Sequence, residues 1–204
     1  MRIIGGQFKS RRLHAPPEDV KTRPITDRVK EAVFNRLMAA GRLGGGAVLD
    51  VFAGTGSLGL EALSRGSDTA TFIERNRIAA RLLERNIEQL GVGKRCDVLR
   101  VDALNTPWWL QLRRKRLALA FCDPPYATVQ ARGGAHRIIK LLERITRLLE
   151  PDGAIVLRLP REIEPLEIAG LVVIEHFPFG SMRVVWYESA VLTPDTAAAP
   201  DQHA

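Results

Sequence analysis

The chain has 204 residues, of which 46% are hydrophobic, so it can build the core of one ordinary domain and is not wholly disordered. Its 30 Lys and Arg residues outnumber its 23 Asp and Glu residues by seven, and a surface with this net charge attracts polyanions such as nucleic acids. The two cysteines, Cys96 and Cys122, have no CxxC motif or histidine cluster beside them, which excludes a disulfide framework and a structural zinc site.

No apolar stretch approaches the roughly 18 residues of a membrane span, and the first residues lack the apolar run of a signal peptide. Together with the isolated cysteines, this indicates a cytoplasmic protein. The sequence has no apolar zipper or exposed apolar helix pattern, so we expect a monomer.

Much of the positive charge lies near the N-terminus, where residues 1–30 hold eight basic and three acidic residues. Strand-like pieces at residues 2–4 and 12–14 flank the Gly5-Gly6 break, and Pro16-Pro17 follows them. We therefore expect residues 1–25 to form a basic, hairpin-like arm, with a merely solvated edge as the alternative.

Apolar residues at helical spacing then predict a helix from the N-cap Thr26 to Gly41. Beyond a run of three glycines, strand-like and helix-like segments alternate. The predicted strands cover residues 47–52, 69–74, 97–101, 117–122 and 154–159. The predicted helices between them cover residues 57–65, 77–90 and 135–150. Two final strands lie near residues 171–176 and 183–188.

This alternation predicts an α/β fold with a Rossmann-like, doubly wound, mostly parallel sheet of seven strands, because parallel neighbours need a crossover connection. The last two strands are joined by a short connection, so we expect them to form an antiparallel hairpin at one sheet edge. The domain would span residues 26–192. Residues 193–204 lack periodicity, and we expect a disordered tail there.

The first functional signal is a glycine-rich loop that joins the predicted strand 47–52 to the predicted helix 57–65. Glycines let the backbone approach a ligand, and the amides at a helix start present hydrogen-bond donors to it. The acidic Asp50 suits the cationic amino-acid part of S-adenosylmethionine (SAM) better than an anionic pyrophosphate, although NAD or a structural turn remain alternatives. The expected cofactor-binding residues of this loop are Asp50, Phe52, Ala53, Gly54, Thr55 and Gly56.

Two further strand ends extend this predicted cofactor site. Glu74 can accept both hydroxyls of a ribose, and Arg75 follows it. Asp102, followed by Ala103, can accept the amino group of an adenine, with a helix N-cap as the alternative.

The most specific motif is Asp123-Pro124-Pro125-Tyr126, at the end of the fourth predicted strand. The lone pair of a nucleobase amine is delocalised into the ring, so the amine needs acceptors that localise the pair. The Asp123 carboxylate and the Pro124 carbonyl can each accept one N–H, Pro125 stiffens the turn, and Tyr126 can stack on the base. A rigid loop is the alternative. We interpret Trp108 and Trp109 as packing residues rather than a platform for a base.

With these residues in view, the chain resembles bacterial class I, SAM-dependent methyltransferases of the RsmD family, the 16S rRNA (guanine-N2)-methyltransferases. The motifs that carry the resemblance are residues 2–6, 11–13, 22–31, 34–35, 50–59, 60–66 and 123–126. Departures from the family pattern at Ile25, Lys30 and Cys122 do not touch the proposed chemistry.

The resemblance implies methyl transfer from SAM to N2 of a guanine in 16S rRNA, within the 30S subunit or a late assembly intermediate. The basic residues expected to contact RNA phosphates are Arg2, Lys9, Arg11, Arg12, Arg23 and Arg28. A DNA amino-methyltransferase acting on adenine N6 or cytosine N4, and a non-catalytic RNA-binding assembly factor, remain the alternatives.

Overall fold

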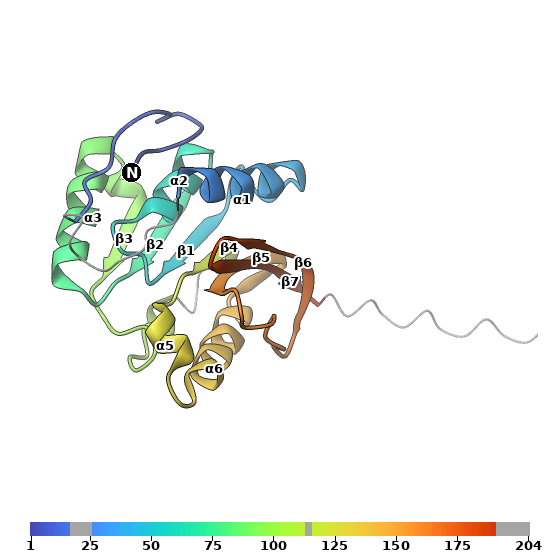
Figure 1. The fold of residues 1–204 in the computed structure, drawn as a ribbon. Coiled ribbons are helices and arrows are strands. Elements are labelled where there is room, and N and C mark those ends of the chain that lie inside the picture. Colours follow the sequence, from blue (N-terminus) through green and yellow to red (C-terminus); the bar gives the residue numbers. More distant parts are fainter. Residues whose placement is uncertain (17–25, 113–115, 191–204) are drawn as a thin grey trace, which may run out of the picture.

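The structure is a computed structural model that describes residues 1–16, 26–112 and 116–190 (Figure 1). The predicted RNA contact Arg23 and the predicted tail 193–204 lie outside these residues. In the described part of the chain, no helix has the length and apolar character needed to cross a membrane.

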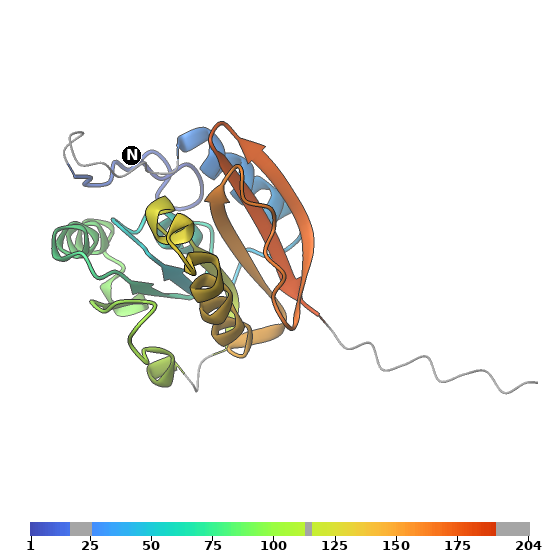
Figure 2. The ribbon, with the colours of Figure 1, turned by 60° about the horizontal axis from the view of Figure 1, so that its bottom comes forward.

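A seven-stranded sheet with strand order β3-β2-β1-β4-β5-β7-β6 forms the centre of the molecule. β1 to β5 pair in parallel, whereas β7 is antiparallel to both β5 and β6, so the predicted Rossmann-like fold with an antiparallel edge hairpin is confirmed (Figure 2). The strands are β1 Ala47–Val51, β2 Thr69–Ile73, β3 Cys96–Leu99, β4 Leu117–Cys122, β5 Leu149–Pro160, β6 Leu171–Phe179 and β7 Met182–Ser189.

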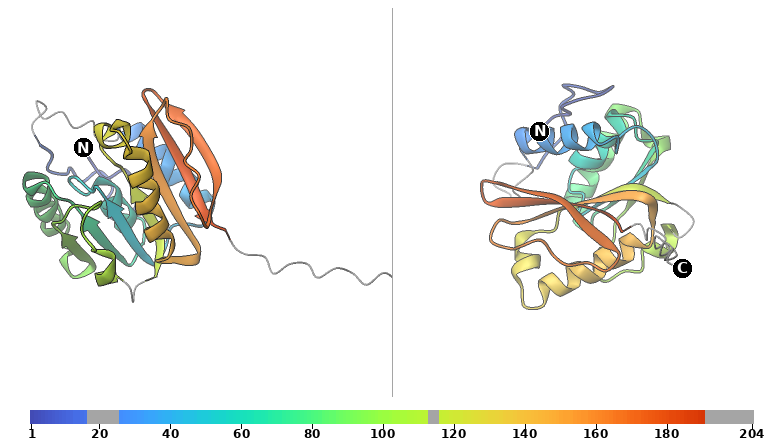
Figure 3. Two further views of the ribbon diagram at one scale, coloured as in Figure 1. Left: turned by 90° about the horizontal axis from the view of Figure 1, so that it is seen from below. Right: turned by 90° about the vertical axis from the view of Figure 1, so that its right-hand side faces the viewer.

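Helices cover both faces of this sheet, as the edge-on view in Figure 3 makes visible for α1 and α6. The apolar faces of α1, α2 and α3 pack on one side and those of α4, α5 and α6 on the other, because successive strand residues point to opposite faces. The helices are α1 Asp27–Ala39, α2 Ser57–Ser64, α3 Arg77–Leu90, α4 Trp109–Leu112, α5 Tyr126–Gln130 and α6 Gly134–Thr146, with a 3₁₀ turn at Gly93–Arg95.

Local signals account for several of these boundaries. Thr26 caps α1 as expected, since its hydroxyl accepts a hydrogen bond from the Val29 N–H. Asn76 caps α3 in the same way, and the left-handed Gly91 ends that helix.

The N-terminal segment, residues 1–16, is less regular than two paired strands. Arg2 and Arg12 form a single antiparallel bridge, so the expected pairing is present only in its smallest form. The buried side chains of Ile3 and Leu13 pack with α2 and α3. The segment therefore lies against the domain rather than projecting from it (Figure 1).

Candidate functional site

The two predicted motifs meet at the carboxyl ends of β1 and β4. These strands are parallel neighbours, with Val51 beside Cys122, and the Asp123 N–H donates to the Val51 carbonyl at 3.2 Å. The strand order reverses between them, which is where doubly wound sheets bind ligands. The glycine-rich loop and the residues 123–126 thus belong to one site.

The glycine-rich loop has an unusual backbone. Phe52, Gly54 and Gly56 all adopt positive φ, at 62°, 57° and 83°. Phe52 is the notable one, because a side chain disfavours this conformation and such strain concentrates at ligand sites. Thr55 and Ala53 are buried between these turns, and the Gly56 N–H donates to the Ala53 carbonyl at 2.8 Å.

The three glycines of the loop and of α2 have different roles. A Cβ on Gly56 would lie 2.3 Å from Leu83 Cδ1, and one on Gly59 would lie 2.4 Å from Phe72 Cε1. These two glycines therefore allow close packing of α2 on α3 and on the sheet. A Cβ on Gly54 would meet no atom within 4 Å, so this glycine borders open space at the strand ends.

Asp50 is almost completely buried and organises the start of α2. Its Oδ2 accepts the Gly59 N–H at 2.8 Å. Burial raises the pKa of Asp50 well above its ordinary value, the Gly59 hydrogen bond partly offsets this, and the nearby carboxylates of Asp123 and Glu74 add to it. The expected contact of Asp50 with a cofactor stays a prediction.

Glu74 directly follows β2 as predicted, whereas Asp102 lies three residues after the end of β3, which ends earlier than the predicted strand 97–101. The carboxylate of Glu74 accepts the N–H groups of Gly54 at 2.8 Å and Asn76 at 2.7 Å, which ties the end of β2 to the glycine-rich loop. Asp102 pairs with Arg75 at 2.9 Å and accepts the Leu104 N–H at 2.8 Å. Burial alone would raise the pKa of Asp102, but these partners lower it overall.

Trp108 is a core residue. It is fully buried, and its indole N–H donates to the carbonyl of the buried Ala103 at 2.9 Å, in line with the interpretation as packing. Trp109 is half-buried, and the Arg144 guanidinium lies 4.3 Å from its ring centroid.

The Asp123 carboxylate lies beside Arg158 of β5, a residue that the sequence analysis did not single out. β4 and β5 pair with Cys122 beside Leu157, so the next residues, Asp123 and Arg158, are also neighbours. Arg158 Nε donates to Asp123 Oδ1. The pair borders a cavity of about 10 Å³, whose other lining residues are Val33, Leu58, Cys122, Val156 and Val184.

This environment sets the protonation of Asp123. Burial raises the pKa of Asp123 to about 6, while the charge and the hydrogen bond of Arg158 act in the opposite direction. Pro124 is buried, Pro125 precedes the first turn of α5, and Tyr126 begins that helix. The Arg158 guanidinium lies 5.9 Å from the centroid of the Tyr126 ring, so Arg158 lies beside two of the predicted site residues, Asp123 and Tyr126.

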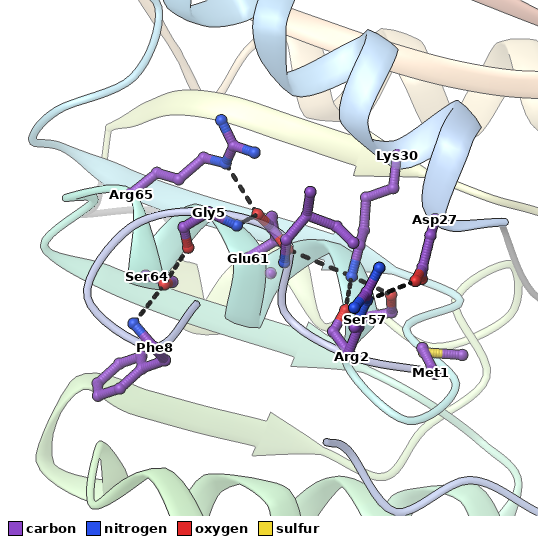
Figure 4. Close-up of polar contacts among 12 residues, drawn as sticks. Met1, Arg2, Gly5, Phe8, Asp27, Lys30, Ser57, Glu61, Ser64 and Arg65 are labelled. Carbon is purple, nitrogen blue, oxygen red and sulfur yellow. Dashed lines mark hydrogen bonds and ion pairs between the residues drawn. The ribbon is translucent and has the colours of Figure 1, made fainter. Parts of the chain in front are cut away.

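A second buried polar cluster is centred on Glu61 of α2, to which the sequence had assigned no role (Figure 4). This carboxylate is fully buried and accepts the N–H groups of Ile4 and Gly5, both at 2.8 Å. It also pairs with Lys30 at 3.2 Å and Arg65 at 2.8 Å. Glu61 is the one charged residue of the helix 57–64, and this was the available signal.

Lys30 links this cluster to the glycine-rich loop. Its buried ammonium donates to the Arg2 carbonyl and to Ser57 Oγ at 3.3 Å, and Ser57 is the first residue of α2 (Figure 4). Burial lowers the pKa of Lys30, although Glu61 opposes this shift. The N-terminal segment is therefore fixed through α1 and α2 next to the predicted cofactor loop.

The predicted RNA contacts in the described chain all have exposed side chains. These residues are Arg2, Lys9, Arg11, Arg12 and Arg28. Arg2 is partly neutralised, because it pairs with Asp27 at 2.9 Å.

The fold and the loops at its topological switch point define a Rossmann-like α/β class, which solved methyltransferases share. The structure titled "Putative methyltransferase yhhF from Escherichia coli" superposes with a TM-score of 0.75 at 32% identity, covering 94% of this chain and 98% of that one.

The chain belongs to the family described as "Conserved hypothetical protein 95", whose family model matches residues 1–188. It is 35% identical over 189 residues to "Putative rRNA methyltransferase YlbH" of Bacillus subtilis, covering 92% of this chain and 98% of that protein. It is 39% identical over 153 residues to "Ribosomal RNA small subunit methyltransferase D" of Escherichia coli K12, covering 75% of this chain and 68% of that protein. The resemblance to the RsmD family is thereby confirmed.

Proposed function

We propose that this protein is an rRNA methyltransferase that transfers one methyl group from SAM to the exocyclic N2 of a guanine in 16S rRNA. The observation that carries this proposal is the Asp123 carboxylate, held by Arg158 beside the glycine-rich loop. The names of the relatives support rRNA methylation. The base and the 16S target come from the family resemblance.

The residues around the loop fit SAM. Gly54 borders open space, and the carboxylates of Glu74, Asp102 and Asp50 lie at three successive strand ends. Each carboxylate oxygen has two lone pairs, so Glu74 and Asp102 retain acceptor capacity for hydroxyl and amino groups beside their present partners. When bound, SAM supplies an electrophilic methyl group.

The chemistry assigned to this chain is the preparation of the target amine. A carboxylate has about four lone-pair sites, so Asp123 can accept an N–H of the amine while Arg158 occupies Oδ1. The Pro124 carbonyl accepts the second N–H, which turns the nitrogen lone pair towards the methyl group. When the methyl group moves to the amine, its bond to the sulfonium sulfur would break, leaving a neutral thioether, and the nitrogen would become positive. Asp123 would then receive the proton that leaves the nitrogen.

We assign residues 26–192 to the methyltransferase domain and residues 1–25 to RNA contact. Arg2, Lys9, Arg11, Arg12, Arg23 and Arg28 would contact phosphates of the RNA, while the target guanine turns out of its surroundings towards Asp123. Tyr126 would stack on that base.

The experiment is transfer of radiolabelled methyl from SAM to 30S subunits that lack the modification, with naked 16S rRNA and duplex DNA in parallel. Nucleoside digestion then identifies the product. N2-methylguanosine in the subunits supports the proposal. N6-methyladenine or N4-methylcytosine in DNA overturns the substrate, and no transfer to any of them favours a binding factor.

A variant tests the role of Asp123 directly. Asp123→Asn should lower the rate of methyl transfer by about a hundredfold or more, because the amine loses its anionic acceptor. SAM binding, measured by calorimetry, should persist. Retained turnover in this variant is incompatible with the assigned role.

A further inference from the structure

An arginine face runs along α3, outside the site and outside the basic N-terminal segment. Arg77, Arg81 and Arg85 recur at every fourth residue and are all exposed. With a rise of about 1.5 Å per residue, this face spans about 12 Å on one side of the helix. The opposite side, with Leu83 and Ile87, is buried against the rest of the domain.

This face is continuous with the N-terminal segment. Gln89 Nε2 donates to the Arg12 carbonyl at 2.9 Å, and Asn86 exchanges hydrogen bonds with the backbone N–H and carbonyl of His14. Arg85 lies one helical turn before Gln89 on the same side. Figures 1 and 2 accordingly show the N-terminal segment running close to α3.

The other end of the arginine face reaches the rim of the site. α3 begins three residues after Glu74, at the carboxyl end of β2, where the proposed cofactor site lies. Arg77 is the first residue of the helix. The face therefore connects the rim of the site with the exposed Arg12.

The three arginines of α3 outnumber its acidic residues by one. Its acidic residues are Glu84 and Glu88. Arg100, the residue after β3, engages Glu84. No ion pair between described residues involves Arg77, Arg81 or Arg85. A row of exposed guanidinium groups without carboxylate partners is suited to phosphate oxygens.

We propose that the arginine face of α3 is a second phosphate-binding surface, which continues the contacts of Arg11 and Arg12 along the RNA backbone towards the site. This inference rests on the proposed function, since it presumes an RNA substrate. It assigns the positioning of that substrate to two elements, the N-terminal segment and α3, rather than to the N-terminal segment alone.

The test compares wild type with the triple variant Arg77→Gln, Arg81→Gln, Arg85→Gln. Binding of transcribed 16S rRNA is measured over a series of KCl concentrations. Each lost phosphate contact should reduce the slope of log affinity against log salt by about 0.7, so the slope should fall by about 2. At saturating RNA the methylation rate should stay near wild type, while KM rises.

A matched control removes charge from the opposite end of the sheet. Arg116 precedes β4, and its guanidinium donates to the carbonyl of Arg147, the residue after the end of α6. Arg116→Gln with Arg147→Gln should leave the salt slope unchanged. The control removes two charges instead of three, so a fall of about 1.4 in its salt slope would mean that only net charge matters, which overturns the inference.

The remaining outcomes separate the two proposals. An RNA-binding wild type and a triple variant with an unchanged salt slope refute the α3 surface and leave the proposed function standing. A wild type that neither binds nor methylates RNA refutes both. If circular dichroism shows that the triple variant is unfolded, the single variant Arg81→Gln tests the α3 surface instead. Its salt slope should fall by about 0.7, and an unchanged slope refutes the surface.

Discussion

At the residue scale, the contact between Asp123 and Arg158 governs the protonation of the proposed site. The ionised carboxylate is the stronger acceptor for an amine N–H, and it is the form that can receive the proton that leaves the amine. Because the pKa of Asp123 is raised to about 6, its carboxylate becomes protonated as the pH falls below that value. We therefore predict that the single-turnover methylation rate rises with pH through a midpoint near the pKa of about 6.

The same contact predicts the effect of removing the guanidinium. Arg158 lowers the pKa of Asp123, so Arg158→Gln should move the midpoint of the pH profile to higher pH. Arg161→Gln is the control, because this exposed arginine lies three residues further on and contacts the Gly180 carbonyl. A reduced rate with an unmoved midpoint would show that Arg158 does not act through the charge of Asp123.

Glu61 allows a further prediction at this scale. Glu61→Gln leaves the buried Lys30 ammonium without its carboxylate, and breaking a buried ion pair in this way typically costs about 3–5 kcal/mol. The variant should unfold at a lower urea concentration. Limited proteolysis should also cut the N-terminal segment more readily, since Glu61 accepts the N–H groups of Ile4 and Gly5.

The control for this variant removes an ion pair on the protein surface. Glu84→Gln removes the exposed partner of Arg100 and should change the urea midpoint little, because exposed ion pairs contribute little to stability. Similar midpoints for the Glu61 and Glu84 variants would contradict the structural role given to Glu61.

The sequence predicts only part of the site. Residues in a recognisable motif can be found from the sequence, whereas residues that act through a distant partner cannot. Asp123 and Gly54 stand in recognisable motifs at strand ends, and both lie where predicted. Arg158 and Lys30 act through partners 35 and 31 positions away, respectively. Such contacts depend on strand register and helix packing, which the spacing of residues along the chain does not specify.

At the scale of the elements, Gly54 of the loop and Gly59 of α2 differ in the space around them, so adding a methyl group should have different effects at the two positions. Gly59→Ala would bring a Cβ to 2.4 Å from the buried Phe72 ring and should lower stability by about 1–3 kcal/mol. Gly54→Ala meets open space, so its methyl group should mainly obstruct the proposed cofactor.

The measurements are urea unfolding and calorimetric titration with SAM. Gly54→Ala should weaken SAM binding more than Gly59→Ala, although its positive φ of 57° also carries a cost of about 1–2 kcal/mol. A larger loss of SAM affinity in Gly59→Ala would argue that Gly54 does not border the cofactor.

Predicted and observed element boundaries agree where a local signal marks the end. α3 has its predicted bounds because Asn76 caps its start and Gly91 ends it. The predicted helix 135–150 instead ends at Thr146, and β5 begins at Leu149 rather than residue 154. Leu148 and Leu149 continue the helical spacing, so the pairing of Leu149 with Leu117, a distant contact, decides the boundary. The short helices α4 and α5 have too few residues for any periodicity, and neither was predicted.

At the scale of the whole molecule, the N-terminal segment has two proposed roles: its backbone supports the cofactor loop, and its basic side chains contact RNA. Its backbone is fixed to Glu61, Lys30 and Gln89, close to the cofactor loop, whereas the side chains of Arg11 and Arg12 point into solvent. The segment can therefore present charge to RNA while its backbone keeps the loop in place.

This division predicts a selective defect. Arg11→Ala with Arg12→Ala removes two exposed charges and leaves the backbone hydrogen bonds of both residues possible, including that from the Ile3 N–H to the Arg11 carbonyl at 2.9 Å. The salt slope of RNA binding should fall by about 1.4, while the affinity for SAM stays at its wild-type value. Filter binding and calorimetry measure the two quantities. If both affinities fell together, the side chains of the segment would be part of the cofactor site, and RNA contact could not be assigned to them alone.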